Sequence, residues 1–115
     1  MSAPPRIALD EARAGTPRPG ERSVRLLSHG TLDLRWYAPR GHDAQTPHDR
    51  DEVYVVVSGS GWFRRGEARV PFGPGDALFV AAGIEHRFEE FTEDFGTWVM
   101  FYGPPGGEAP DQRVG

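Results

Sequence analysis

Short runs of β-forming residues, separated at nearly regular intervals by glycine and proline, limit most strongly what this chain can fold into. The 115 residues include 15 Gly and 11 Pro, which break helices and favour turns. Between them we count about eight or nine runs of strand-forming residues. The clearest run is 52–57, where Val53 to Val57 are all β-branched or aromatic. The pattern predicts one all-β domain, a sandwich or a barrel.

The predicted strands fill the middle of the chain. They cover residues 23–28, 31–37, 52–57, 62–65, 68–71, 77–81, 86–91 and 97–102. We expect 1–22 to form a short N-terminal arm, with one or two helical turns between Ile7 and Arg13. Residues 23–103 would then form the barrel, and 104–115 a flexible C-terminal tail.

Composition excludes several classes of function. The net charge is −4, which argues against a basic nucleic-acid surface. The absence of cysteine excludes disulfides, thiolate nucleophiles and Cys-bound metal. No apolar run is long enough to cross a membrane, and the N-terminus lacks the apolar core of a signal peptide. We therefore expect a cytoplasmic protein without nucleic-acid or membrane partners.

The run Val53 to Val57 is apolar on both faces of its strand. One face belongs in the core, and the other must pack against a second sheet or another subunit. We therefore expect a homodimer.

Three side chains have the chemistry of metal ligands, namely His48, Glu52 and His86. Glu52 begins an apolar strand, where a carboxylate is costly to bury without a partner. Two imidazoles and one carboxylate suit a first-row transition metal and leave open positions for water, substrate or dioxygen. Since the chain has four His and 17 acidic residues, such triples also arise among solvated surface residues, and the triple alone does not decide.

The surroundings of these residues resemble the two sequence motifs of the cupin family. His48, Glu52 after three residues, and Gly59 after six more match the second His, the Glu and the final Gly of the first motif. Gly75, Gly83 and His86 match the second motif with its spacing. The resemblance covers Thr31 to Tyr102 and implies a small single-domain cupin. Its fold would be a double-stranded β-helix, or jelly-roll barrel, with a metal held inside.

The first motif is incomplete. Its first His falls on Thr46, a poor ligand, while the Pro and Asn of the second motif fall on Ala81 and Glu90. Three of the family's four usual ligands therefore remain. Water would take the fourth place, or else Gln45, His42 or Thr46. The ligand set implies one divalent transition metal ion but does not choose among iron, manganese, nickel, zinc and copper.

Two functions fit these features. The first is a metal-dependent enzyme, of dioxygenase, isomerase or lyase type, with a small organic molecule as its substrate. Tyr54 and Glu90 are the weak candidates for acid–base catalysis, because each shares the predicted face of a ligand. The alternative is a non-catalytic cupin module that binds a small ligand or uses the metal for stability.

The segment from Glu85 to Asp94 has a local charge of −4, since five acidic residues surround Arg87. Such a segment is usually a solvated face. If it lies at the mouth of the barrel, it would disfavour anionic substrates by repulsion.

Overall fold

The structure, a computed structural model, describes residues 3–109. It contains one short helix, α1 (Leu9–Ala14), and eight strands. The strands are β1 (Val24–His29), β2 (Leu32–Tyr37), β3 (Asp51–Ser58), β4 (Gly61–Arg65), β5 (Ala68–Phe72), β6 (Ala77–Val80), β7 (His86–Glu89) and β8 (Gly96–Tyr102). The predicted all-β fold is confirmed, and each predicted strand is present within a few residues of its expected bounds.

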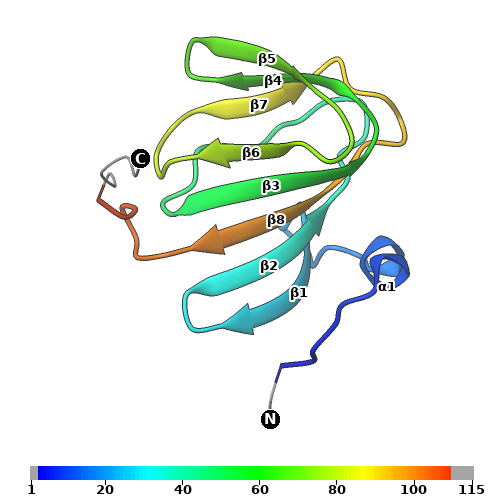
Figure 1. The fold of residues 1–115 in the computed structure, drawn as a ribbon, viewed down its shortest axis with the longest axis vertical. Coiled ribbons are helices and arrows are strands. Elements are labelled where there is room, and N and C mark those ends of the chain that lie inside the picture. Colours follow the sequence, from blue (N-terminus) through cyan, green and yellow to red (C-terminus); the bar gives the residue numbers. More distant parts are fainter. Residues whose placement is uncertain (1–2, 110–115) are drawn as a thin grey trace.

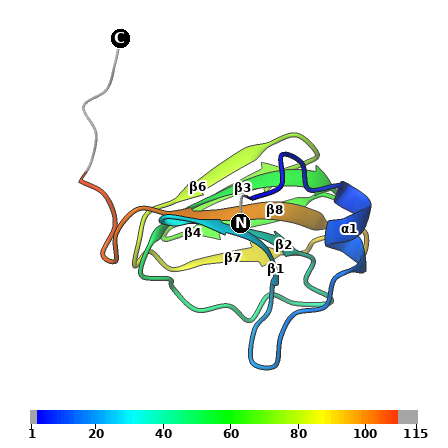
Figure 2. The same ribbon diagram turned by 90° about the horizontal axis from the view of Figure 1, so that it is seen from below.

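The strands form two antiparallel sheets that face each other (Figures 1 and 2). One sheet has five strands in the order β1-β2-β8-β3-β6, and the other has three in the order β5-β4-β7. Strands that are neighbours in a sheet are mostly distant in sequence, as in a jelly roll. This arrangement brings the start of β3 close to the start of β7, although 34 positions separate Glu52 from His86.

The core between the sheets is aromatic. Phe88 of β7 lies at its centre, and its ring packs against those of Tyr54, Phe63, Phe72 and Phe95 at centroid distances of 4.7–5.3 Å. Edge-to-face and tilted contacts at this spacing add to the hydrophobic gain of burial. These rings fill one end of the space between the sheets and leave the other end to polar groups.

An apolar stripe crosses the outer face of the five-stranded sheet. Cross-strand pairs join Phe79 to Val53, Val53 to Met100, Met100 to Leu34, and Leu34 to Leu27. Phe79 is 44% exposed, and the others are half-buried. The N-terminal arm covers the neighbouring part of this face, where Trp36 is buried. The expected homodimer stays a prediction, and this stripe is the surface it would use.

Strand β7 is shorter than predicted. Glu90 has a positive φ of 49°, a conformation that ends strand alternation and is uncommon outside glycine. Its side chain is 73% exposed and bonds to Arg69. Glu90 therefore does not share the inward face of His86, as the sequence had suggested.

Hydrogen bonds hold the segment that follows β8. Within 103–109, the backbone N–H of Gly106 donates to the Asp49 carbonyl, and that of Glu108 to the Asp51 side chain. Residues 110–115 of the predicted tail, and 1–2 of the predicted arm, lie outside the described residues. No helix between residues 3 and 109 has the length and hydrophobicity needed to span a bilayer. The cytoplasmic location stays a prediction.

Candidate metal centre

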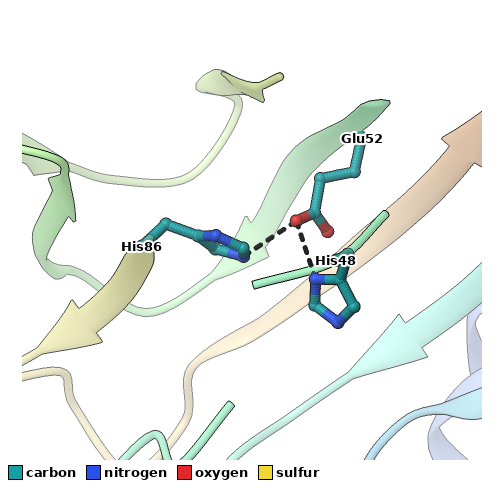
Figure 3. Close-up of side chains that lie close together, drawn as sticks. All are labelled: His48, Glu52 and His86. Carbon is teal, nitrogen blue, oxygen red and sulfur yellow. Dashed lines mark hydrogen bonds and ion pairs between the residues drawn. The ribbon is translucent and has the colours of Figure 1, made fainter. Parts of the chain in front are cut away.

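The three predicted ligands converge at one end of the space between the sheets (Figure 3). Glu52 is the second residue of β3, His86 is the first residue of β7, and His48 lies in the loop before β3. One ligand atom from each lies within 4.8 Å of the other two. The structure therefore brings the three predicted ligands together, and their binding of a metal stays a prediction.

Glu52 lies between the two imidazole rings. Its Oε1 is 2.8 Å from His86 Nε2 and 3.1 Å from His48 Nδ1. Glu52 and His86 are almost completely buried, whereas the side chain of His48 is 34% exposed. Edge-on packing against Phe101, at 4.9 Å between ring centroids, holds the His48 ring. The site is thus deep on one side and open on the side of His48.

The backbone fixes which nitrogen of His86 faces the site. His86 Nδ1 lies 2.9 Å from the Ile84 carbonyl oxygen, which only accepts hydrogen bonds, so Nδ1 carries a proton. Nε2 of the neutral ring then points its lone pair at Glu52 and the site. Metal-binding histidines are oriented in this way by a hydrogen bond from their other nitrogen.

Electrostatics couples Glu52 to the histidines. Burial by itself would raise the pKa of Glu52, but the hydrogen bonds and charges of His48 and His86 outweigh it and lower that pKa. Burial would likewise lower the pKa of His86, but the Glu52 carboxylate outweighs it and raises that pKa. In the absence of metal the two groups therefore favour the charged pair.

The second carboxylate oxygen of Glu52 indicates that a metal ion fits this site. Glu52 Oε2 is buried and has no hydrogen-bond partner among the residues that the structure describes. An unpaired buried carboxylate oxygen costs free energy. A cation bound by the two histidines and this carboxylate would remove that cost. The donor set, neutral imidazole and carboxylate, also suits a divalent transition metal.

A buried polar network adjoins the triad through Tyr54. The Tyr54 hydroxyl lies 3.1 Å from His86 Nε2 and 3.2 Å from Gln45 Oε1. The side-chain amide of Gln45 donates to Asp43 at 2.6 Å. Burial first, and the Glu52 charge second, raise the pKa of Tyr54 well above its usual value. Tyr54 therefore stays a neutral phenol, able to donate a hydrogen bond.

Asp43 organises this network, and it was not among the predicted site residues. Its side chain is 2% exposed and accepts bonds from the Tyr37 hydroxyl, the Gln45 amide and the backbone N–H of Phe88. One sequence signal could have identified Asp43. It precedes Gln45 by two residues, the spacing of an Asx turn, and in the structure its side chain accepts a hydrogen bond from the backbone N–H of Gln45.

The remaining predicted residues fall into two groups. Tyr54 and Gln45 lie at the site, but both polar ends of Gln45 are already bonded to Asp43 and Tyr54. Thr46 is exposed and lines the adjoining cavity. His42 is exposed, and Glu90, just after β7, is exposed and paired with Arg69, so neither belongs to the group of potential ligands.

Two backbone connections hold the loops that carry the histidines. The N–H of Gly83 donates to the His48 carbonyl at 2.6 Å. The φ of Gly83 is +79°, a conformation that favours glycine. Asp51, 4% exposed, accepts the N–H groups of Ala82 and Glu108 at 2.9 and 2.8 Å. The loop before His86 and the segment after β8 are therefore both tied to the residue next to Glu52.

A cavity of about 440 Å³ opens beside the triad. His48 and Tyr54 line it at the metal centre, and Val99 and Phe101 of β8 form an apolar wall. This volume is in the range of pockets for small molecules, about 300–1,000 Å³. His48 of the triad therefore borders a pocket that could hold a small substrate.

Comparison with known proteins identifies the family and agrees with the fold. The sequence profile of the cupin domain, Cupin_2, matches residues 35–102, more than half of the chain. This protein belongs to the cupin family. It is 39% identical over 98 residues to "Uncharacterized protein SCO3923" of Streptomyces coelicolor, a match that covers 84% of this chain and 93% of that one.

Solved structures share the fold. The plu4264 protein of Photorhabdus luminescens has a TM-score of 0.65 and 16% identity, with coverage of 90% of this chain and 89% of that one. A Cupin 2 conserved barrel domain protein of Salinispora arenicola has a TM-score of 0.64 and 21% identity, with coverage of 89% and 91%. At these identities the likeness concerns the fold alone.

Proposed function

We propose that this cupin is a metal-dependent enzyme that acts on a small organic molecule, through dioxygenase, isomerase or lyase chemistry. The observation that carries the proposal is the convergence of His48, Glu52 and His86 beside a cavity of about 440 Å³. Three protein ligands leave coordination positions open, as catalytic metal sites do, whereas structural zinc sites are closed by a fourth protein ligand.

In the proposed enzyme, some residues would bind the metal and others would contact the substrate. His48, Glu52 and His86 would hold one divalent transition metal ion. When bound, such an ion supplies Lewis acidity or a place for dioxygen. Tyr54, a neutral phenol beside His86, would donate a hydrogen bond to an oxygen of the substrate. Val99 and Phe101 would exclude water from one side of it.

One observation favours the alternative, a non-catalytic module that binds a small ligand. Glu52 Oε1 already lies within hydrogen-bond distance of both histidines, so the triad is also a coherent ion-pair cluster without a metal. A metal-free form of this alternative differs from the proposed enzyme in a measurable property, the metal content of the protein.

The test is elemental analysis of protein purified without an affinity tag. We expect close to one transition metal per chain in the native protein, and a large loss in the double variant His48→Ala/His86→Ala. The double variant His29→Ala/His42→Ala is the matched control, because both of those histidines are exposed. Equal metal content in all three proteins would end the assignment of the site.

A second measurement separates catalysis from binding. Metal-loaded protein is incubated with small organic molecules in an oxygen electrode, and the products are followed by proton NMR. A dioxygenase consumes oxygen, whereas an isomerase or lyase changes the NMR spectrum without oxygen uptake. If the metal-containing protein binds one of these molecules but converts none of them, the result supports the non-catalytic alternative.

A further inference from the structure

We propose that the cavity beside the metal centre takes a small organic acid, and that Arg22 binds its carboxylate. This names a substrate class for the proposed function and rests on it only in treating the cavity as the substrate pocket. The charged side chains around the cavity come from segments that are distant in sequence.

The cavity lies on the concave face of the five-stranded sheet. Asp33 and Arg35 of β2 pair with Phe101 and Val99 of β8, and all four line the cavity. The segment before β1 supplies Arg22, and the loop after His48 supplies Arg50. One wall is therefore apolar, while three guanidinium groups lie at other parts of the lining.

Two of these arginines are already paired with carboxylates. Arg35 contacts Asp33 at 3.0 Å and Glu21 at 3.4 Å. Arg50 contacts Asp33 at 3.6 Å and donates to the Thr31 carbonyl at 2.8 Å. These charges hold the wall together, and Glu21 is further bonded to Arg25 outside the cavity.

Arg22 differs from the others. Its guanidinium donates to the Ala44 carbonyl oxygen, a neutral acceptor. Within residues 3–109, no carboxylate lies at ion-pair distance from it. An arginine has five N–H donors in a planar fork that matches a carboxylate. Arg22 therefore retains donors and an unneutralised positive charge at the edge of the cavity.

The whole lining does not repel anions. Asp49 also lines the cavity, so the acidic groups there are Glu21, Asp33 and Asp49. Two of these are paired with arginine. The unpaired charges that face an entering ligand are thus the exposed Asp49 and the exposed Arg22. Burial and the Asp43 carboxylate raise the pKa of the Tyr37 hydroxyl, which also lines the cavity, and the positive charge of Arg22 opposes that rise, so this charge is felt inside the cavity.

The acidic segment that could have excluded an anion lies elsewhere. Glu89 bonds to Arg64 and Arg69, and Glu90 bonds to Arg69. These residues belong to the three-stranded sheet and its edge, and neither Glu89 nor Glu90 lines the cavity. The repulsion considered from the sequence therefore does not apply, and an acid can reach the pocket.

The test measures binding of matched pairs of probes by titration calorimetry. Each pair is an acid and its uncharged amide: lactate and lactamide, succinate and succinamide, benzoate and benzamide. Metal-free and metal-loaded protein are both titrated at low ionic strength, where charge attraction is least screened. We expect at least one acid to bind about tenfold or more tightly than its amide, the size of a hydrogen bond to a charged group.

Variants locate the effect. Arg22→Gln should remove the preference for the acid, and Arg22→Lys should keep part of it, because lysine keeps the charge but not the fork. Arg40→Gln is the matched control, since Arg40 is exposed, donates to the Glu93 carbonyl and does not line the cavity. We expect it to bind as the native protein does.

The outcomes separate this inference from the proposed function. Acid binding that depends on Arg22 in protein that never takes up metal would support the inference while overturning the metal enzyme. Metal binding with no acid preferred over its amide, or with the preference intact in Arg22→Gln, would overturn the inference alone.

Discussion

The Oε1 atom of Glu52 lies 2.8 Å from Nε2 of His86, and the two side chains are 1% and 0% exposed. Since Nδ1 of His86 is committed to the Ile84 carbonyl, a second proton on this ring would lie on Nε2, between the two groups. A metal ion held by the triad would occupy the place of that proton. Metal and proton therefore compete for the same nitrogen.

Metal affinity should consequently depend on pH. The pKa of His86 is raised above 6.5, because Glu52 outweighs the effect of burial. We expect the affinity for Zn²⁺ to fall steadily as the pH is lowered from about 8 to about 5, where the imidazole holds its proton. Competition against a chelator of known affinity at each pH measures this. An affinity that is constant after correction for the chelator would contradict the role of His86.

The stability of the metal-free protein should have a maximum in pH. Because folding lowers the pKa of Glu52, this carboxylate stabilises the fold above pH 4.5. That stabilisation is lost as the pH falls through the pKa that Glu52 has in the folded protein. Because folding raises the pKa of His86, this imidazole stabilises the fold below pH 6.5. That stabilisation is lost as the pH rises through the pKa that His86 has in the folded protein. We expect the free energy of unfolding, measured with urea, to be highest between pH 4.5 and pH 6.5. In Glu52→Gln the decline on the alkaline side should disappear; its persistence would assign that decline to other groups.

Asp43 should be essential for folding stability. Its loss in Asp43→Ala would leave Tyr37, Gln45 and the backbone N–H of Phe88 without an acceptor in a buried place. We expect a loss of about 3–5 kcal/mol in the free energy of unfolding, because several buried hydrogen-bond donors lose their acceptor together. The surface variant Glu90→Gln should change it by about 0.5 kcal/mol or less. Similar values for the two variants would refute the importance of the network.

Tyr54 should contribute to stability without being needed for metal uptake. Tyr54→Phe removes a hydroxyl that contacts Gln45 and His86 and should cost about 1 kcal/mol of unfolding free energy. Because the ligand set is His48, Glu52 and His86, we expect the metal content to equal that of the native protein. Loss of metal in elemental analysis would show that the phenol belongs to the coordination sphere.

The fold was largely predictable, because its strands are delimited by local signals. Turn residues mark the ends of nearly every strand, and the run from Val53 to Val57 identifies the central one. The triad was predictable for a different reason, since the spacing of His48, Glu52 and His86 is similar to that of the cupin motifs. Both signals lie within short stretches of sequence.

The rest depends on side chains brought together by topology. Nothing near Glu90 in sequence reveals its positive φ or its bond to Arg69, 21 positions away. The burial of Asp43 depends on a bond to Phe88, 45 positions away. Arg22 reaches the cavity only because the loop at Ala44 folds back to it. Such contacts have no signature in local hydrophobic patterns.

The apolar stripe of the five-stranded sheet leads to a prediction of assembly. If the expected homodimer forms through this face, the native protein should sediment with twice the mass of the chain. Phe79→Glu would place a charge on the most exposed residue of the stripe, at its β6 end, and should give monomers. Val70→Glu is the control, because Val70 is equally exposed, at 43% against 44% for Phe79, but lies on the other sheet. A native protein that sediments as a monomer at micromolar concentration contradicts the prediction.

Asp51 joins three segments by one carboxylate: the strand that carries Glu52, the loop at Ala82 that leads to His86, and the chain at Glu108. The segment at Glu108 is therefore mechanically linked to the loop that leads to His86. Changes in length or sequence around Glu108 offer a remote means of adjusting the spacing of the ligands, without replacing any of them. Fusion partners for laboratory use are accordingly better attached at the opposite terminus.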